Sequence, residues 1–262
     1  MVVKIKNILL SFDIEEFDLP LEFGKNISEK DQLEISRRGT EKIIELLNKN
    51  NIKATFFVSA KFAERYPELI KTISKNHEIG LHCLEHRDDY SKMDEKEAYI
   101  KIKTGKEIIE KIISKKIIGF RSPRFQQVPY VILNKIGIIY DSSLNPTYIP
   151  GTYNNFFSSR KNISKNNIKI VPISVSPVLR LPIFWLAFRN LPLFYAKHIT
   201  NRNENYVCLV FHPWEFVDIS EMGLPGLITR NTGEKLIKKL QKYITDYKKF
   251  KFTTMSSYLL TS

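Results

Sequence analysis

The chain has 262 residues, 43% of them hydrophobic and 12% aromatic, which is enough for a sizeable core and excludes a disordered protein. Lysine and arginine exceed aspartate and glutamate by 41 to 28, which gives a formal charge of +13 at pH 7. The lysines are scattered along helical stretches and interleaved with glutamates, so we assign this excess to solvated helix faces and expect no nucleic-acid partner.

Apolar runs alternate with helical periodicities along almost the whole chain. Strands are predicted at 7–14, 54–58, 78–82, 117–121, 138–141, 168–173 and 206–211, with a short last strand at 252–254. Helices are predicted at 36–50, 66–75, 94–114, 128–136 and 232–247, and Asp94 is the expected N-cap of the third. The polar segment 142–168 is expected to be an irregular insertion or lid.

This alternation predicts an α/β fold with a mostly parallel sheet, and we expect a single domain over residues 1–262. The number of units favours a distorted (β/α) barrel of about seven parallel strands that is closed or nearly closed. In such folds the chemistry collects at the carboxyl ends of the strands. Polar residues occur at or just after five predicted strand ends: Asp13 with Glu15, His82, Arg121, Asp141 and His212. We therefore expect an active site at this edge of the sheet.

A pair of histidines four residues apart, His82 and His86, follows the third predicted strand. This spacing places both imidazoles on one side of a helical turn, close enough to share one metal ion. Two histidines leave at least one protein ligand missing, and a carboxylate is the usual third. The acidic end of the first strand, at 13–16, supplies the candidates.

Four motifs, in this order, resemble those of the polysaccharide deacetylase family, the NodB-homology domain of carbohydrate esterase family 4. They are the acidic strand end Phe12-Asp13-Ile14-Glu15-Glu16, the pair His82 and His86, Arg121-Ser122-Pro123, and the strand end Val210-Phe211-His212-Pro213. The chain is most similar to a divergent branch in which the first motif reads Asp-x-Glu and the last reads His-Pro-Trp-Glu. The resemblance covers nearly the whole chain.

The resemblance implies a single divalent metal, zinc in the first place, with cobalt, nickel and manganese as alternatives. Its ligands would be Glu15, His82 and His86, a set that suits Zn²⁺ and leaves a position open for water and substrate. Asp13 would be the general base, and Arg121 would pair with it. His212 would be the general acid. The oxyanion would be held by the metal and by the backbone N–H of Arg124.

The first motif departs from the family's usual adjacent acids, because Ile14 separates Asp13 from Glu15. Residues two apart in a strand point the same way, so the geometry of this strand end must differ, for example by a bulge. Glu16 is an alternative metal ligand. The residue that orients His212 stays open between Asp141 and Glu215, and the aromatic wall of an acetyl pocket stays open among Trp185, Trp214 and Phe125.

The apolar segment 178–195 is interrupted by two prolines, Arg180 and Arg189, and is too broken to span a bilayer. It is either a buried helix with a loop, or an interfacial element that contacts a membrane or a lipid tail, with its arginines at the headgroups. The N-terminus has no signal-peptide pattern, and two cysteines are too few for a disulfide framework. We therefore expect a cytoplasmic protein that can be peripheral at the inner membrane face.

These observations lead us to expect a metal-dependent hydrolase of surface-glycan biosynthesis. It would remove an N-acetyl group from a polysaccharide, an oligosaccharide or a lipid-linked saccharide. One alternative is an amidase that acts on a C–N bond outside sugars. Another is a catalytically silent glycan-binding domain, although such a module needs neither an acid nor a base, and Asp13, Arg121 and His212 are all present.

Overall fold

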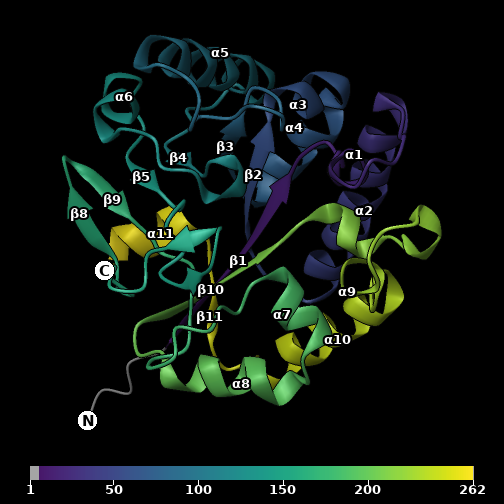
Figure 1. The fold of residues 1–262 in the computed structure, drawn as a ribbon. Coiled ribbons are helices and arrows are strands. Elements are labelled where there is room, and N and C mark those ends of the chain that lie inside the picture. Colours follow the sequence, from purple (N-terminus) through teal and green to yellow (C-terminus); the bar gives the residue numbers. More distant parts are fainter. Residues whose placement is uncertain (1–5, 262) are drawn as a thin grey trace.

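The computed structural model describes residues 6–261, and its centre is a curled, mostly parallel nine-stranded sheet (Figure 1). Eight strands follow the order β10-β1-β2-β3-β4-β5-β9-β8, and β11 pairs with the start of β1. Only β8 runs antiparallel, to β9. The strands are β1 (Asn7–Ile14), β2 (Thr55–Ser59), β3 (Glu78–Cys83), β4 (Gly119–Phe120), β5 (Tyr140–Asp141), β8 (Ile163–Lys165), β9 (Ile168–Ile170), β10 (Tyr206–Phe211) and β11 (Lys251–Phe252). The predicted parallel α/β barrel is confirmed.

The barrel is nearly closed by the segment that follows β9. The Ser174 N–H donates to the carbonyl of Cys208 in β10 at 3.1 Å, and the Cys208 N–H donates back to Ser174 Oγ at 2.9 Å. These bonds bridge the gap between the two sides of the sheet. At the amino ends of the strands, α11 (Met255–Thr261), which had no counterpart among the predicted helices, covers the barrel interior.

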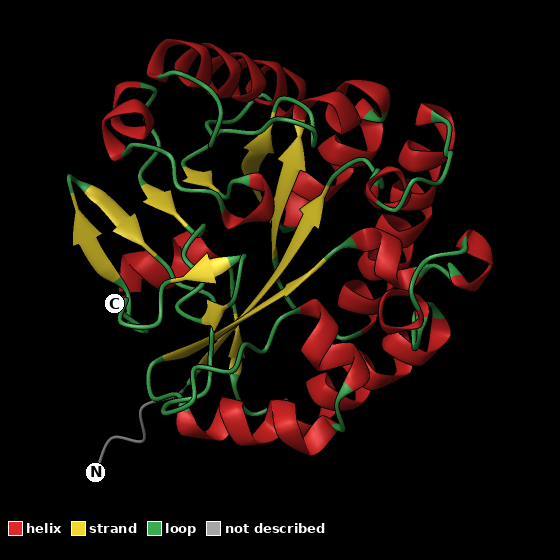
Figure 2. Cartoon of the chain, viewed as in Figure 1, coloured by secondary structure: helices red, strands yellow, loops and turns green. Residues whose placement is uncertain are grey.

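Helices surround the outside of the curled sheet (Figure 2). They are α1 (Leu19–Glu22), α2 (Glu29–Lys49), α3 (Ala60–Arg65), α4 (Pro67–Asn76), α5 (Glu95–Ile113), α6 (Tyr130–Lys135), α7 (Trp185–Asn190), α8 (Leu193–Arg202), α9 (Gly226–Thr229) and α10 (Glu234–Asp246), with short 3-10 turns η1 (Pro123–Phe125), η2 (Pro213–Phe216) and η3 (Ser220–Met222). Asp94 caps α5 as predicted, because its Oδ1 accepts from the Glu97 N–H at 2.8 Å.

Strand β1 shows how the alternation of side chains divides the core. Its even-numbered residues, Ile8, Leu10, Phe12 and Ile14, are fully buried in the layer between the sheet and the helices. The odd-numbered residues, Leu9, Ser11 and Asp13, point into the barrel. The same strand therefore builds the hydrophobic layer on one face and supplies polar groups on the other.

Several predicted boundaries were wrong. Helix α2 begins at Glu29 rather than at 36, because Ser28 Oγ accepts from the Asp31 N–H at 3.1 Å and starts the helix in a polar stretch. Helix α3 was missed, since its six residues are too few to show a periodicity. The segment 142–168 is not wholly irregular: it contains a hairpin of β6 (Tyr148–Ile149) and β7 (Tyr153–Asn154), and strand β8.

The apolar segment 178–195 contains the expected helix with a loop. Residues 178–181 form an exposed loop, whereas Phe188 in α7 is buried. The expectation that both arginines lie at lipid headgroups was wrong, because Arg189 is 1% exposed and pairs with Glu215 at 2.7 Å. Within residues 6–261, the helices include none that is long and apolar enough to cross a bilayer.

Candidate metal centre and active site

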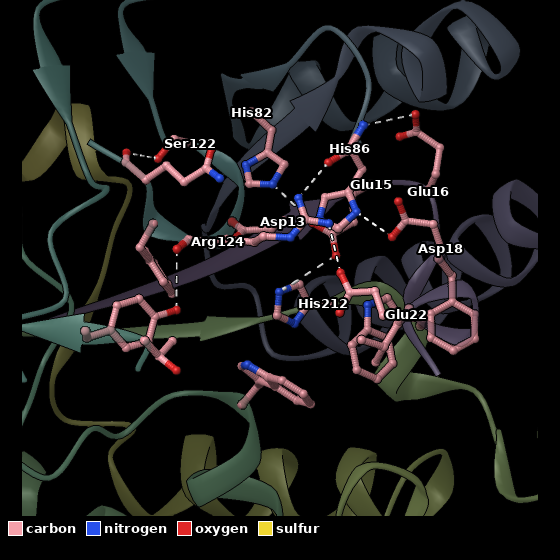
Figure 3. A pocket seen from close by; sticks show the side chains of 18 of the residues that line it. Asp13, Glu15, Glu16, Asp18, Glu22, His82, His86, Ser122, Arg124 and His212 are labelled. Atoms are coloured by element: carbon pink, nitrogen blue, oxygen red, sulfur yellow. Dashed lines mark hydrogen bonds and ion pairs between the residues drawn. The ribbon is translucent and has the colours of Figure 1, made fainter. Parts of the chain in front are cut away.

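The carboxyl ends of β1 and β3 bring Glu15, His82 and His86 together, as predicted (Figure 3). Glu15 Oε2 lies 3.1 Å from His82 Nε2 and 3.2 Å from His86 Nε2, and the three ligand atoms all lie within 4.8 Å of one another. All three side chains are buried. Among the residues that the structure describes, these three side chains form a group whose ligand atoms lie close enough together to hold one metal ion.

The other ring nitrogen of each histidine fixes the tautomer. His82 Nδ1 lies 2.7 Å from the carbonyl oxygen of Arg121, and His86 Nδ1 lies 2.7 Å from Asp18 Oδ1. A carbonyl oxygen can only accept, so Nδ1 of His82 carries the proton, and the carboxylate of Asp18 favours the same for His86. Since Nδ1 of each ring is engaged by an acceptor, Nε2 is the nitrogen of both histidines that faces Glu15 and that could coordinate a metal ion.

Glu16, the alternative ligand, points away from this cluster. Its Oε2 accepts from Ser59 Oγ at 2.6 Å, and its Oε1 accepts from the His86 backbone N–H at 3.3 Å. Residues Ser11 to Ile14 of β1 pair with β2 in regular register, so the described pairs show no bulge there. The strand instead ends at Ile14, and Glu15 leaves the alternation of the sheet.

Asp13 lies inside the barrel and pairs with Arg121 at 2.8 Å. The guanidinium is completely buried; it also donates to Ser11 Oγ and Ser142 Oγ, both at 2.9 Å, and lies 4.3 Å from the centre of the Phe57 ring. Asp13 lines the pocket, whereas Arg121 does not. Arg121 is therefore a positioning residue behind Asp13.

His212 follows β10 and faces the cluster from the opposite wall (Figure 3). Its Nε2 lies 3.9 Å from Glu15 Oε1, and its Nδ1 lies 3.3 Å from Glu215 Oε1. Glu215 is completely buried and is held in turn by Arg189. The choice left open by the sequence thus falls on Glu215, because Asp141 instead accepts from the Ser143 N–H at 3.0 Å.

A close packing contact fixes the turn that carries His212. Helix α2 packs against η2 so tightly that a Cβ added at Gly39 would lie 1.8 Å from the carbonyl oxygen of Pro213. No side chain fits there, so glycine is required for the close approach of helix and turn. Trp214 stacks on the His212 ring with centroids 5.3 Å apart, which holds the imidazole from its other face.

The electrostatics of the cluster depend on its close packing. Burial alone would raise the pKa of Glu15, but the nearby His86, His212 and His82 lower this pKa well below its usual range. Burial likewise opposes protonation of His86, yet Glu15 and Asp18 raise its pKa to about 9. Burial also opposes protonation of His212, and Glu15 and Glu215 raise its pKa nonetheless. The site therefore holds a charged carboxylate among imidazoles.

These groups line a pocket of about 410 Å³. Trp185, Trp214 and Phe125, the three candidates for an aromatic wall, all line it, together with Phe17 and Tyr153. Sequence reasoning missed Asp18, Glu22, Gln126 and Tyr153 as lining residues, since they lie in loops or in elements too short to show a periodic pattern. Arg124, which also lines the pocket, has a left-handed backbone (φ 54°) and donates to the His86 carbonyl at 3.1 Å.

Comparisons with known proteins agree with this geometry. A polysaccharide deacetylase profile matches residues 4–138. A peptidoglycan-N-acetylglucosamine deacetylase of Bacillus cereus is 34% identical over 92 residues, which cover 35% of this chain and 31% of the relative. The chain thus matches about a third of that relative's length.

Two solved structures share the fold. A protein of Mycobacterium smegmatis assigned to the polysaccharide deacetylases has a TM-score of 0.67 at 19% identity, over 97% of this chain and 88% of its own. The Puue allantoinase has a TM-score of 0.65 at 17% identity, over 98% of this chain and 90% of its own. The profile match over half of the sequence shows that the chain belongs to the polysaccharide deacetylase family.

Proposed function

We propose that this protein is a metal-dependent N-deacetylase that hydrolyses an acetamide on a saccharide. The observation that carries the proposal is the convergence in one pocket of a three-ligand cluster, Glu15, His82 and His86, with a carboxylate and a further imidazole on its flanks. A pocket that only bound a glycan would need neither the charged carboxylate at Asp13 nor the supported imidazole at His212.

The three residues fit a zinc ion by their own chemistry. Two imidazoles and one carboxylate suit Zn²⁺, and both Nδ1 atoms are occupied by acceptors, so that both Nε2 atoms are free to coordinate. Cobalt, nickel and manganese remain alternatives for the same donor set. When bound, the metal would supply a Lewis acid for the acetamide carbonyl and the attacking water.

The chain's own residues would move the protons. Asp13, held by Arg121, would accept a proton from the water that adds to the carbonyl carbon. His212, supported by Glu215, would donate a proton to the nitrogen as the C–N bond breaks, which yields acetate and a free amine. The backbone N–H of Arg124, at the pocket wall, is our candidate donor to the oxyanion.

The aromatic lining supports a saccharide as the substrate. Trp185, Trp214 and Tyr153 offer flat apolar faces for the acetyl group and the sugar ring, and Asp18, Glu22 and Gln126 offer hydrogen-bond partners. We place the enzyme in surface-glycan biosynthesis, with a polymer, an oligosaccharide or a lipid-linked saccharide as its substrate. Our second candidate is an amidase that acts on a C–N bond outside sugars. The Puue allantoinase, which shares the fold, motivates this alternative.

The test combines metal analysis with acetate release. We expect about one zinc per chain and acetate release from N-acetylated oligosaccharides, with no turnover of cyclic amides. Asp13→Asn should keep the metal and lower turnover by ~10²–10⁴-fold, because only the general base is removed. Asp246→Asn, at a carboxylate that pairs with Lys197 and Lys242 outside the pocket, serves as the control. A protein without affinity for zinc, or undiminished turnover by Asp13→Asn, would contradict the proposal.

A further inference from the structure

Four large apolar side chains are exposed on the two loops that follow β7 and β9. The side chains of Phe157, Val178, Leu179 and Leu181 are 96%, 78%, 68% and 45% exposed; we call these four residues the apolar rim. Arg180 joins its two segments, because its guanidinium donates to the carbonyl of Ser158 at 3.0 Å and lies 5.7 Å from the centre of the Phe156 ring. Large apolar side chains that are exposed on two linked loops indicate an interaction site.

The backbone of the 176–182 loop is built to display these side chains. The Ser176 N–H donates to the Leu181 carbonyl at 2.8 Å, the Leu181 N–H donates to Ser176 Oγ at 3.0 Å, and Thr147 Oγ1 donates to the Arg180 carbonyl at 2.6 Å. Arg180 has a left-handed backbone (φ 55°), which is uncommon for a residue other than glycine. Two N–H groups and two carbonyl groups of this loop are thus satisfied within the protein, which fixes the shape of the loop.

Positive charge lies directly beside the rim. Arg160, Lys161 and Arg202 line a hollow of about 260 Å³ whose wall also includes Pro177, the neighbour of Val178. Glu204 is the acid of this hollow and lies 3.4 Å from Lys161, so that the three cations exceed it by two charges. Together with the overall charge of +13, this arrangement matches an anionic surface and opposes the pairing of two copies through this face.

The rim is also connected to the catalytic pocket. Thr147, which bonds the rim loop, precedes the β6–β7 hairpin, and Gly151, Thr152 and Tyr153 of this hairpin line the pocket. On the other side, Trp185 of the pocket wall follows Leu181 by four residues. The rim loop is therefore linked to the wall of the pocket through two short segments of chain, while the hollow beside the rim lies at the start of β10 and His212 follows the end of that strand.

We propose that the apolar rim attaches this protein to an anionic phospholipid surface, with Val178, Leu179 and Phe157 in the acyl boundary and Arg160, Lys161 and Arg202 at the phosphates. If the proposed function holds, the substrate class that this placement favours is an N-acetylated saccharide carried on a phospholipid. Attachment itself does not depend on that function and is measured without turnover.

The experiment is flotation of the full chain with vesicles of phosphatidylcholine alone or mixed equally with phosphatidylglycerol. We expect binding to the anionic vesicles, and a loss of at least ~10-fold in Val178→Ser/Leu179→Ser. Ile100→Ser/Leu260→Ser, which changes side chains 51% and 86% exposed on α5 and α11, should bind within about twofold of the wild type. Phe157→Ser provides a second rim variant on a separate loop.

A charge arm tests the headgroup contact. Lys161→Gln/Arg202→Gln should weaken binding by about fivefold per charge, whereas Lys92→Gln/Lys103→Gln, with the same change in net charge, should have little effect. Zinc affinity should be unchanged in every variant, which separates this result from a failure of the catalytic proposal. Absence of binding to anionic vesicles would overturn the inference. So would an equal loss in the Ile100 control, or a dimer in vesicle-free solution that Val178→Ser/Leu179→Ser abolishes.

Discussion

Asp18 contacts His86, one of the three proposed metal ligands, and its replacement gives a sharp test of the site. The Asp18 Oδ1 to His86 Nδ1 distance is 2.7 Å, and the two side chains are only 14% and 11% exposed. A charged hydrogen bond in such surroundings contributes ~1.5–3 kcal/mol. At about 1.4 kcal/mol per tenfold change, Asp18→Asn should weaken zinc binding by ~10–100-fold, because a neutral amide replaces the charged acceptor that polarises the imidazole.

The measurement is a zinc titration of the metal-free protein in competition with a chromophoric chelator at neutral pH, so it needs no substrate. Glu22→Gln is the matched control, since Glu22 also lines the pocket but pairs with Arg124 at 2.9 Å instead of a histidine. The two variants remove the same charge from the same pocket. A zinc affinity of Asp18→Asn within twofold of the wild type, or an equal loss in Glu22→Gln, would refute the role of this hydrogen bond.

Three further outcomes are expected. Gly39→Ala should destabilise the protein by ~1–3 kcal/mol in urea unfolding, because its Cβ would overlap the Pro213 carbonyl; unchanged stability would contradict this packing. Burial lowers the pKa of His77 to about 4. The contribution of the neutral imidazole to the free energy of unfolding is therefore full above pH 6.5 and is lost as the pH falls toward 4. His77→Gln should reduce this dependence of the free energy of unfolding on pH. Arg189→Met should cost ~3–5 kcal/mol by leaving the Glu215 charge unpaired, and Arg189→Met/Glu215→Gln should recover part of this loss; no recovery would argue against the buried ion pair.

Much of the fold followed from local patterns. Clear signals came from the apolar runs of β1, β2, β3 and β10 and from the helical periodicity of α5. These patterns are clear because each element packs one face or both against the core. Since parallel strands end at one edge of the sheet, the polar residues at these ends could be expected to meet, and Asp13, His82 and His212 do line one pocket. The short elements, α3 and the β6–β7 hairpin, were missed because few residues carry no periodicity.

What the sequence determined by itself was therefore the parallel α/β barrel and the chemical types of its strand-end residues. Only the tertiary structure decided between Glu15 and Glu16, because the choice depends on where β1 ends and on the hydrogen bond that turns Glu16 toward Ser59. It alone chose Glu215, three residues from His212 in the turn η2, over Asp141, and it revealed Asp18 beside His86, a contact that long-range packing creates. Residues far apart in the chain meet through the packing of whole elements, which no local spacing encodes.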